Sequence, residues 1–254
     1  MEGSLEAKPP SPEKKFSRKE DPMNRSEIEN CLLCNSPLNT QMDWKGLFFN
    51  RFPKTICHEC EEKFVRYNHD KDKEVFSLYE YNKPMQDYLH RYKFMHDVLL
   101  AKVFAEPIHQ CLKNRKEMIV PIPMHPQKLK DRTFAHVDEL LKQAQIPFVH
   151  VLEKTTMETQ GGKTREERMN TPQIFRLKEN AQIKDRDILL VDDIYTTGTT
   201  IRHAKRALME GGAKSVKAFT LIRVSGFHDQ TIDRSSPANQ KITSPQVPKN
   251  IKKW

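Results

Sequence analysis

The segment ILLVDDIYTTGTT, residues 188–200, constrains the fold more than any other stretch of this chain. Its first four residues are apolar and have the length and composition of a buried strand. Asp192 and Asp193 follow at once, then a turn with one glycine, and then residues 200–210, which space their apolar side chains along one helical face. A strand that leads through a turn into a helix is typical of α/β folds, in which ligands bind at the carboxyl ends of parallel strands.

Elsewhere in the chain, short apolar runs alternate with amphipathic stretches. Residues 118–122 and 216–222 are candidate strands, and residues 131–145 place apolar side chains on one face of a predicted helix. This alternation predicts an α/β domain over residues 75–224, in which a parallel sheet is flanked by helices.

The turn after the two acids offers the groups that an anion needs. A glycine-containing turn that opens a helix presents backbone N–H groups at the positive end of the helix dipole, and threonine hydroxyls add donors. Asp192 and Asp193 instead suit hydroxyl donors, so a ligand with vicinal hydroxyls near a phosphate, such as a ribose 5-phosphate, satisfies both. The alternative is that Asp193 and Thr197 only cap the helix. The predicted ligand-binding residues of this segment are Asp192, Asp193, Thr196, Thr197, Gly198, Thr199 and Thr200.

Four of the five cysteines form two CxxC pairs near the amino end of the chain. This spacing is close to that of four-thiolate zinc ribbons, and a short segment with few apolar residues needs such a crosslink to fold. The alternatives are a redox-active CxxC motif and free thiols. We expect a structural Zn²⁺ in a small module over residues 26–70, because four protein ligands leave no open coordination position. The predicted ligands are Cys31, Cys34, Cys57 and Cys60.

The composition indicates an anionic partner. The net charge is +9 and the pI is about 9.2, which favours a phosphorylated metabolite, a nucleic acid or an acidic protein surface. No run approaches the roughly 18 apolar residues of a membrane span, and no secretory signal is evident, so we expect a cytoplasmic protein without membrane insertion. Residues 1–25 and 225–254 are polar and proline-rich and are expected to be flexible tails. The sequence leaves open whether they are native or, for the first, a tag remnant.

The segment LLVDDIYTTGTT resembles the phosphoribosyl pyrophosphate loop of the type I phosphoribosyltransferases, in which two acids hold the ribose hydroxyls and the turn holds the 5-phosphate. The resemblance extends over residues 31–223 and narrows to the ComF family, in which a cysteine module is fused to a phosphoribosyltransferase domain. Residues 78–97 resemble the segment that leads into this domain, residues 120–141 its pyrophosphate-loop region and residues 159–175 its mobile loop. The resemblance implies a type I phosphoribosyltransferase-like parallel sheet flanked by helices, with a small N-terminal zinc module.

The resemblance also implies ligand contacts outside the acid pair. It assigns Arg132 to the site as a cation that meets the pyrophosphate and Arg168 as a cation in the glycine-containing segment able to close as a lid, and the alternative for each is a solvated surface charge. It also implies a Mg²⁺ ion held with the phosphoribosyl ligand. The chain departs from the family at 132–136, where RTFAH stands in place of the common RGFNQ. Transferases that act on purine bases carry an aspartate base at the position of Thr196, so no catalytic residue is predicted.

The ComF resemblance implies a competence protein that supports the uptake or handling of transforming single-stranded DNA, beside a helicase-like partner. Basic and aromatic residues interleave in 48–52 and 90–96, which suits single-stranded DNA but is also common in core and surface segments. The second hypothesis is an active phosphoribosyltransferase with an amine or nucleobase acceptor. A third is an adaptor that binds its partner through the zinc module.

Overall fold

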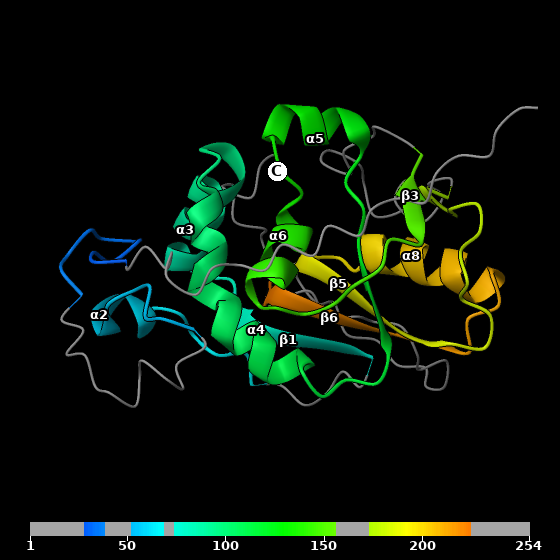
Figure 1. The fold of residues 1–254 in the computed structure, drawn as a ribbon, viewed down its shortest axis with the longest axis horizontal. Helices are drawn as coiled ribbons and strands as arrows, with labels where there is room; N and C mark the ends of the chain where they lie inside the picture. Colours follow the sequence, from blue (N-terminus) through cyan, green and yellow to red (C-terminus); the bar gives the residue numbers. More distant parts are fainter. Residues whose placement is uncertain (1–27, 39–51, 69–73, 156–172, 225–254) are drawn as a thin grey trace, which may run out of the picture.

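A computed structural model describes residues 28–38, 52–68, 74–155 and 173–224 of the 254-residue chain. Its centre is a four-stranded parallel sheet between two layers of helices (Figure 1). The sheet follows the order β1-β6-β5-β2, and all three pairings are parallel. The strands are β1 Val75–Glu80, β6 Ser215–Arg223, β5 Asp187–Tyr195 and β2 Met118–Pro121. The parallel α/β prediction and its three predicted strands are confirmed, whereas β1 was not predicted as a strand.

Alternate residues of β5 belong to the two hydrophobic cores of the domain. Leu189 and Val191 face one core, and Ile188 and Leu190 face the other, because successive side chains of a strand point to opposite faces. The first core is covered by α3 Lys83–Phe94, the 3-10 helix η1 Val98–Phe104, α4 Ala105–Leu112 and α6 His136–Gln143. The second is covered by α8 Thr199–Glu210 and the antiparallel pair β3 Leu152–Lys154 and β4 Phe175–Leu177.

The predicted helix over residues 131–145 is wrong as a single element. The structure has α5 Pro126–Arg132 and then α6, and the two are separated by Thr133, whose φ is 64°. A left-handed backbone at a threonine is unfavourable, and glycine adopts it readily. The pattern RGFNQ, which the resemblance gives for this segment, has glycine at this position, so the break in the helix suits that pattern better than it suits threonine.

Strand β5 continues further than its apolar run. The sequence predicted a strand that ends at Val191, but β5 runs to Tyr195 and includes both acids among its last residues. Asp192 pairs in register with Thr220 of the neighbouring β6, so the backbone of the acid pair is fixed by the sheet. The sheet thereby presents the two carboxylates at its carboxyl end.

The cysteine module lies at one end of the molecule, where its helix α2 His58–Glu61 is close to α3 and α4 (Figure 1). It shares the first core of the domain, since Phe64 packs edge-on against Tyr79, Tyr88 and Phe104. Within the described ranges, no helix has the length and apolar character that crossing a membrane requires.

Candidate functional site

A cavity of about 290 Å³ opens at the carboxyl ends of β2 and β5. Its walls come from α3, from the segment between β2 and α5, from α5 and α6, from β3, and from the start of α8. The polar residues of its lining include Lys93, Lys128, Arg132, His136, Asp138, Lys154, Asp192, Asp193, Thr196 and Thr200. A concave site with converging polar groups, at the carboxyl end of a parallel sheet, is where α/β domains bind ligands.

The two acids are held by different partners. Asp193 is 8% exposed, and its Oδ2 lies 2.6 Å from Nζ of Lys93, which reaches it from α3. Asp192 is half-buried, and its Oδ1 accepts a hydrogen bond of 2.9 Å from the backbone N–H of Asp193. Asp193 is therefore part of a buried ion pair, whereas Asp192 has no such cation in contact among the described residues.

The pKa values of the two acids reflect this difference. Burial raises the pKa of Asp192 to about 7, the negative charge of Asp193 adds to the rise, and Lys93 and Lys154 oppose it. Burial also works to raise the pKa of Asp193, but the charge and hydrogen bond of Lys93 outweigh it, and the pKa falls below its usual value. The pair thus holds one stable negative charge and one carboxyl group that titrates close to neutrality.

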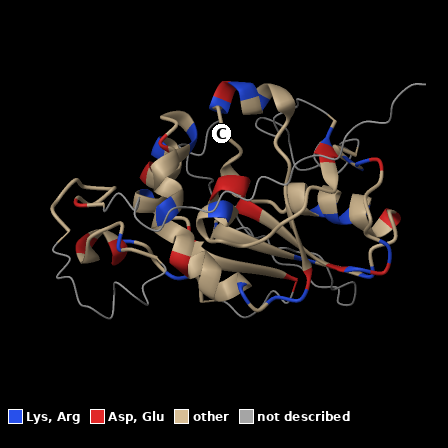
Figure 2. Cartoon of the chain, in the orientation of Figure 1, with Lys and Arg blue, Asp and Glu red and all other residues tan. Residues whose placement is uncertain are grey.

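Cations gather in the same cavity. The ribbon of α5, which carries two of them, is marked largely by charged residues (Figure 2). Burial lowers the pKa of Lys128, and the charges of Lys154, Arg132 and Lys93 lower it further. Burial also lowers the pKa of Lys154, with Asp192 opposing and Arg132 adding to the fall. These cations repel one another, and an anion with several negative charges, such as a diphosphate, would relieve the repulsion.

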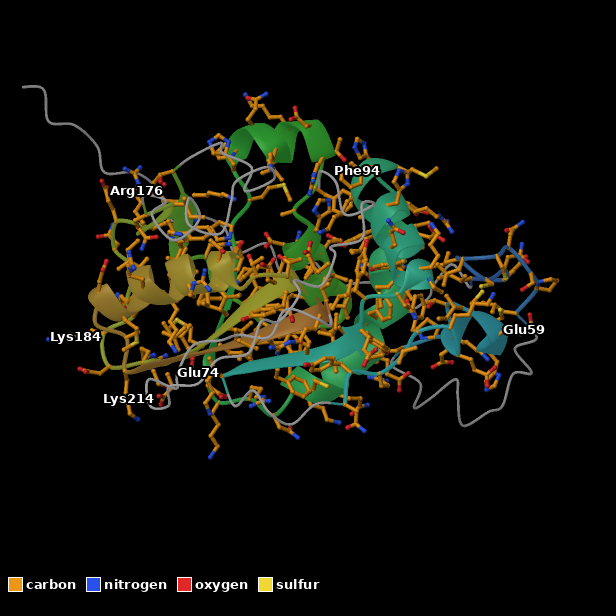
Figure 3. All side chains as sticks on the ribbon, turned by 180° about the vertical axis from the view of Figure 1, so that it is seen from behind. Glu59, Glu74, Phe94, Arg176, Lys184 and Lys214 are labelled. Atoms are coloured by element: carbon orange, nitrogen blue, oxygen red, sulfur yellow. The ribbon has the colours of Figure 1, made fainter. Side chains whose placement is uncertain are left out.

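Arg132 is oriented by two neighbours. Its guanidinium carbon lies 5.1 Å from the ring centre of Phe94, at the end of α3 near α5 (Figure 3), and Nη1 lies 3.3 Å from Nδ1 of His136. A guanidinium group only donates hydrogen bonds, so Nδ1 of His136 is the acceptor. Phe94 itself stacks on His90, with ring centres 5.8 Å apart.

His136 is buried in the wall of the cavity, at the position of the glutamine in the RGFNQ pattern that the sequence resembles. Because its Nδ1 accepts, the proton of the neutral ring is on Nε2. Burial lowers the pKa of His136 to about 3, although Asp193 acts to raise it, so the ring is neutral near pH 7. Nε2 is the one buried side-chain nitrogen or oxygen in the described part of the chain without a hydrogen-bond partner. The cavity wall therefore contains an unsatisfied N–H donor.

The turn at the start of α8 has a glycine in the left-handed conformation, since φ of Gly198 is 70°. Gly198 is also the N-cap of α8, and no side chain forms a capping hydrogen bond there. The alternative that Asp193 and Thr197 cap this helix is therefore wrong. Thr197 instead shares a hydroxyl contact of 3.0 Å with Thr199.

The predicted ligand contacts are only partly brought together. Asp192, Asp193, Thr196, Thr200 and Arg132 all line the cavity. Thr197, Gly198 and Thr199 shape the turn beside it, and they are not among the lining residues. Arg168 lies outside the described residues.

The four predicted metal ligands form a separate cluster in the cysteine module. One ligand atom from each of the four cysteines lies within 4.8 Å of the others, and the Sγ atoms of Cys34 and Cys57 are 3.7 Å apart. Tetrahedral zinc with Zn–S bonds of about 2.3 Å needs sulfur atoms about 3.8 Å apart. The four thiols thus fit a closed zinc site, and all four are free of disulfides.

Comparisons with known proteins agree with this arrangement. A family model described as "Phosphoribosyl transferase domain" matches residues 129–245. The competence protein ComFC of Streptococcus pneumoniae is 34% identical over 219 residues, which cover 76% of this chain and 99% of that protein. The chain belongs to the ComF family. ComFC of Bacillus subtilis is 29% identical over 227 residues, and these residues cover 76% of this ComF chain and 94% of the Bacillus protein.

The ComF domain has a type I phosphoribosyltransferase-like fold with a four-cysteine cluster at its amino end. Among solved structures, a hypoxanthine phosphoribosyltransferase of Staphylococcus aureus aligns over 55% of this chain and 68% of its own, with 14% identity and a TM-score of 0.31.

Sequence reasoning missed several residues of the ComF cavity, above all Lys93, His136 and Lys154. For Lys93 a signal was present. Met85, Tyr88, Leu89 and Tyr92 are the buried residues of α3, and a lysine four positions after Leu89 continues this face. A lysine on the apolar face of a helix needs a buried acid as its partner.

Proposed function

We propose that this ComF-family protein supports natural competence in the cytoplasm, and that its cavity binds phosphoribosyl pyrophosphate or a related phosphoribosyl ligand. One observation supports this choice of ligand: an acid pair, the amino end of a helix and a group of cations surround one cavity at the carboxyl end of the sheet. Few ligands combine vicinal hydroxyls, a monophosphate and a diphosphate on one small molecule.

Each part of the ligand has a matching part of the site. The oxygens of Asp192 and Asp193 accept hydrogen bonds from the ribose hydroxyls. Thr196 in the turn before α8 and Thr200 in the first turn of α8 contact the 5-phosphate at the positive end of the helix. Lys128, Arg132 and Lys154 are the cations that would meet the diphosphate. Arg168 remains a proposed contact from the resemblance alone.

A Mg²⁺ ion would accompany the ligand, neutralising its diphosphate. Mg²⁺ retains several waters and binds mainly through substrate phosphates, so the protein needs few direct ligands for it. In the cysteine module we propose a structural Zn²⁺ held by all four thiolates, because their spacing fits tetrahedral coordination.

The competence role includes contact with single-stranded DNA. Two curated relatives are named as competence proteins, and the chain carries a net charge of +9. Ring and cation contacts among His90, Phe94 and Arg132, with Met95 64% exposed next to them, provide the mixed aromatic and basic surface that single strands prefer. Fluorescence anisotropy with a labelled oligonucleotide at several salt concentrations tests this contact. A helicase-like protein is the proposed partner.

The ligand proposal is tested by calorimetric titration of phosphoribosyl pyrophosphate with Mg²⁺. The wild-type protein should give saturable heat, and the Asp192→Asn, Asp193→Asn double variant should give none. Asp187→Asn is the matched control, because Asp187 begins the same strand at the opposite end from the cavity and pairs with Lys214. Absence of binding in a folded wild-type protein would contradict the proposal.

Transferase activity is a separate question from ligand binding. Release of pyrophosphate in the presence of amine and nucleobase acceptors would show that the site also catalyses transfer. Saturable binding without pyrophosphate release would assign the cavity a binding role only.

A further inference from the structure

The two acids of the cavity each use one oxygen to contact the protein. Oδ1 of Asp192 accepts the backbone N–H of Asp193 at 2.9 Å, and Oδ2 of Asp193 contacts Nζ of Lys93 at 2.6 Å. Among the described residues, no other hydrogen bond or ion pair reaches either carboxylate. One oxygen of each acid is therefore left to accept a hydrogen bond from a ligand.

The contact between Lys93 and Asp193 differs from the surface ion pairs of this protein. Each of the two side chains is only 11% exposed, whereas Lys83 and Asp87 pair with 73% and 60% exposure. A buried ion pair is held firmly, because either partner left alone would be an uncompensated charge away from water. Lys93 also comes from α3, so it joins the end of β5 to an element that is distant in sequence.

We infer that Lys93 is a positioning residue that makes the acid pair selective for a vicinal diol. The inference rests on the proposed function and concerns the ribose part of the ligand. By fixing Asp193 through Oδ2, Lys93 leaves Oδ1 as its acceptor, and the backbone N–H similarly leaves Oδ2 of Asp192. Two fixed acceptors then match two neighbouring hydroxyls.

The expected consequence is discrimination between sugars. A ligand that lacks one of the two hydroxyls leaves a carboxylate oxygen without a donor inside the cavity, and unpaired buried polar groups are unfavourable. Without Lys93, the carboxyl group of Asp193 turns or takes up a proton, and its free oxygen no longer has a fixed direction. Affinity for the diol then decreases more than affinity for the deoxy sugar.

The experiment compares ribose 5-phosphate with 2-deoxyribose 5-phosphate by calorimetry. The wild-type protein should prefer the ribose compound by about tenfold or more, the effect of one hydrogen bond to a charged group. In Lys93→Met the preference should fall to about twofold or less. Lys93→Arg, which keeps a cation for Asp193, should restore most of it.

Lys128→Met is the matched control. It removes a cation from the same cavity, and no ion pair of Lys128 with the acid pair is among the described contacts. It should change the affinity for both sugar phosphates by the same factor and leave their ratio unchanged. This separates the loss of a positive charge from the cavity, which acts alike on two ligands with the same phosphate, from the loss of carboxylate positioning, which affects only the diol.

The results that would overturn the proposed function and the role of Lys93 are distinguishable. If wild-type protein binds neither the two sugar phosphates nor phosphoribosyl pyrophosphate with Mg²⁺, the proposed function fails and the role of Lys93 with it. If it binds both equally, or if folded Lys93→Met keeps the wild-type ratio, only the role of Lys93 is wrong. Should Lys93→Met lack the wild-type circular dichroism spectrum, Lys93→Gln replaces it, and a wild-type ratio in that variant overturns the inference equally.

Discussion

Asp192 and Asp193 are adjacent in β5, yet their pKa values shift in opposite directions. Burial and the neighbouring charge raise the pKa of Asp192 to about 7, whereas Lys93 outweighs burial and lowers the pKa of Asp193. The difference arises from α3, because Lys93 contacts only the second acid. Two neighbouring carboxyl groups that are partly removed from water destabilise the folded protein. Such local destabilisation is typical of ligand sites.

Asp192→Asn should therefore stabilise the ligand-free protein at high pH. The pKa of Asp192 is higher in the folded protein than in the unfolded chain, so the folded state binds the proton more tightly and loses stability as the pH rises from about 4 to about 7. Asparagine does not titrate and still accepts the backbone N–H of residue 193. We expect a thermal midpoint roughly 3 °C above wild type at pH 8 and little difference at pH 4, measured by differential scanning fluorimetry.

Asp187→Asn is the control for this change, and its effect should have the opposite sign. Hydrogen bonds from Ser215 and Lys214 lower the pKa of Asp187, so the charged form supports the folded state above the usual pKa of an aspartate. A stabilisation by Asp192→Asn that is equal at pH 4 and pH 8 would contradict the electrostatic explanation.

His136 should make the protein sensitive to acid. Burial lowers its pKa to about 3, below the value of about 6.5 in the unfolded chain, so the unfolded state binds the proton first as the pH falls. Stability due to the neutral ring is thus present above pH 6.5 and is lost progressively toward pH 3. In His136→Gln, which introduces the residue common in the family, the thermal midpoint should fall less between pH 7 and pH 4.5. His136→Leu should reduce the dependence of the thermal midpoint on pH in the same way. If the thermal midpoints of both variants fall with pH as much as that of the wild type, this role of His136 is refuted.

Much of the β5 and α8 region could be predicted, because its signals are local. An apolar run, two acids, a glycine and an amphipathic helix lie in one continuous stretch, and each feature constrains its own backbone. The pairs of cysteines are equally local, since two CxxC motifs at this spacing have few other uses. Both the parallel sheet and the clustering of the four thiols follow from such patterns.

The rest of the cavity depends on contacts between distant segments. Lys93 meets Asp193 only because α3 packs against the end of the sheet, and a lysine in an amphipathic stretch usually faces solvent. The division of residues 131–145 was hidden because Thr133 adopts a conformation that its residue type disfavours. Strand β1 was missed because its exposed Phe76 and buried Ser77 reverse the usual placement of apolar and polar side chains.

Removal of the proposed zinc should weaken the ligand site as well as the cysteine module. Arg91 of α3 donates hydrogen bonds of 3.0 and 2.9 Å to the carbonyl oxygens of Leu33 and Leu32, which lie between two of the cysteines. Lys93 follows two residues later on the same helix. Treatment with a strong chelator should lower the thermal midpoint by on the order of 10 °C and reduce the affinity for phosphoribosyl pyrophosphate.

Two serine variants serve as controls for the metal. Cys60→Ser removes one of the four clustered thiols and should reproduce the chelator effect, with less than one zinc bound per chain by elemental analysis. Cys111→Ser leaves the cluster intact and should retain full zinc content. Unchanged ligand affinity in chelated, folded protein would show that the module does not support the site.

Gly198→Ala should disrupt the turn that opens α8. The φ of Gly198 is +70°, and a Cβ atom there would collide with the hydroxyl of Tyr195 and lie 2.9 Å from its Cζ atom. The ring of Tyr195 has little room to move, because it is buried and Arg223 stands 4.6 Å from its centre. The turn must shift, and with it the backbone N–H groups proposed to bind the 5-phosphate. We expect the affinity for ribose 5-phosphate to fall about tenfold or more in calorimetric titration.

Gly212→Ala is the matched control, since it also places a side chain at positive φ but at the far end of α8. The φ of Gly212 is +90°, and the nearest atom to an added Cβ is Cγ of Lys184 at 3.7 Å, an ordinary contact. Both variants should lose about 1 kcal/mol of stability from the strained backbone alone. Only Gly198→Ala should lose ligand affinity, because only its turn borders the cavity. Equal affinities in the two variants would show that the 5-phosphate does not bind at the amino end of this helix.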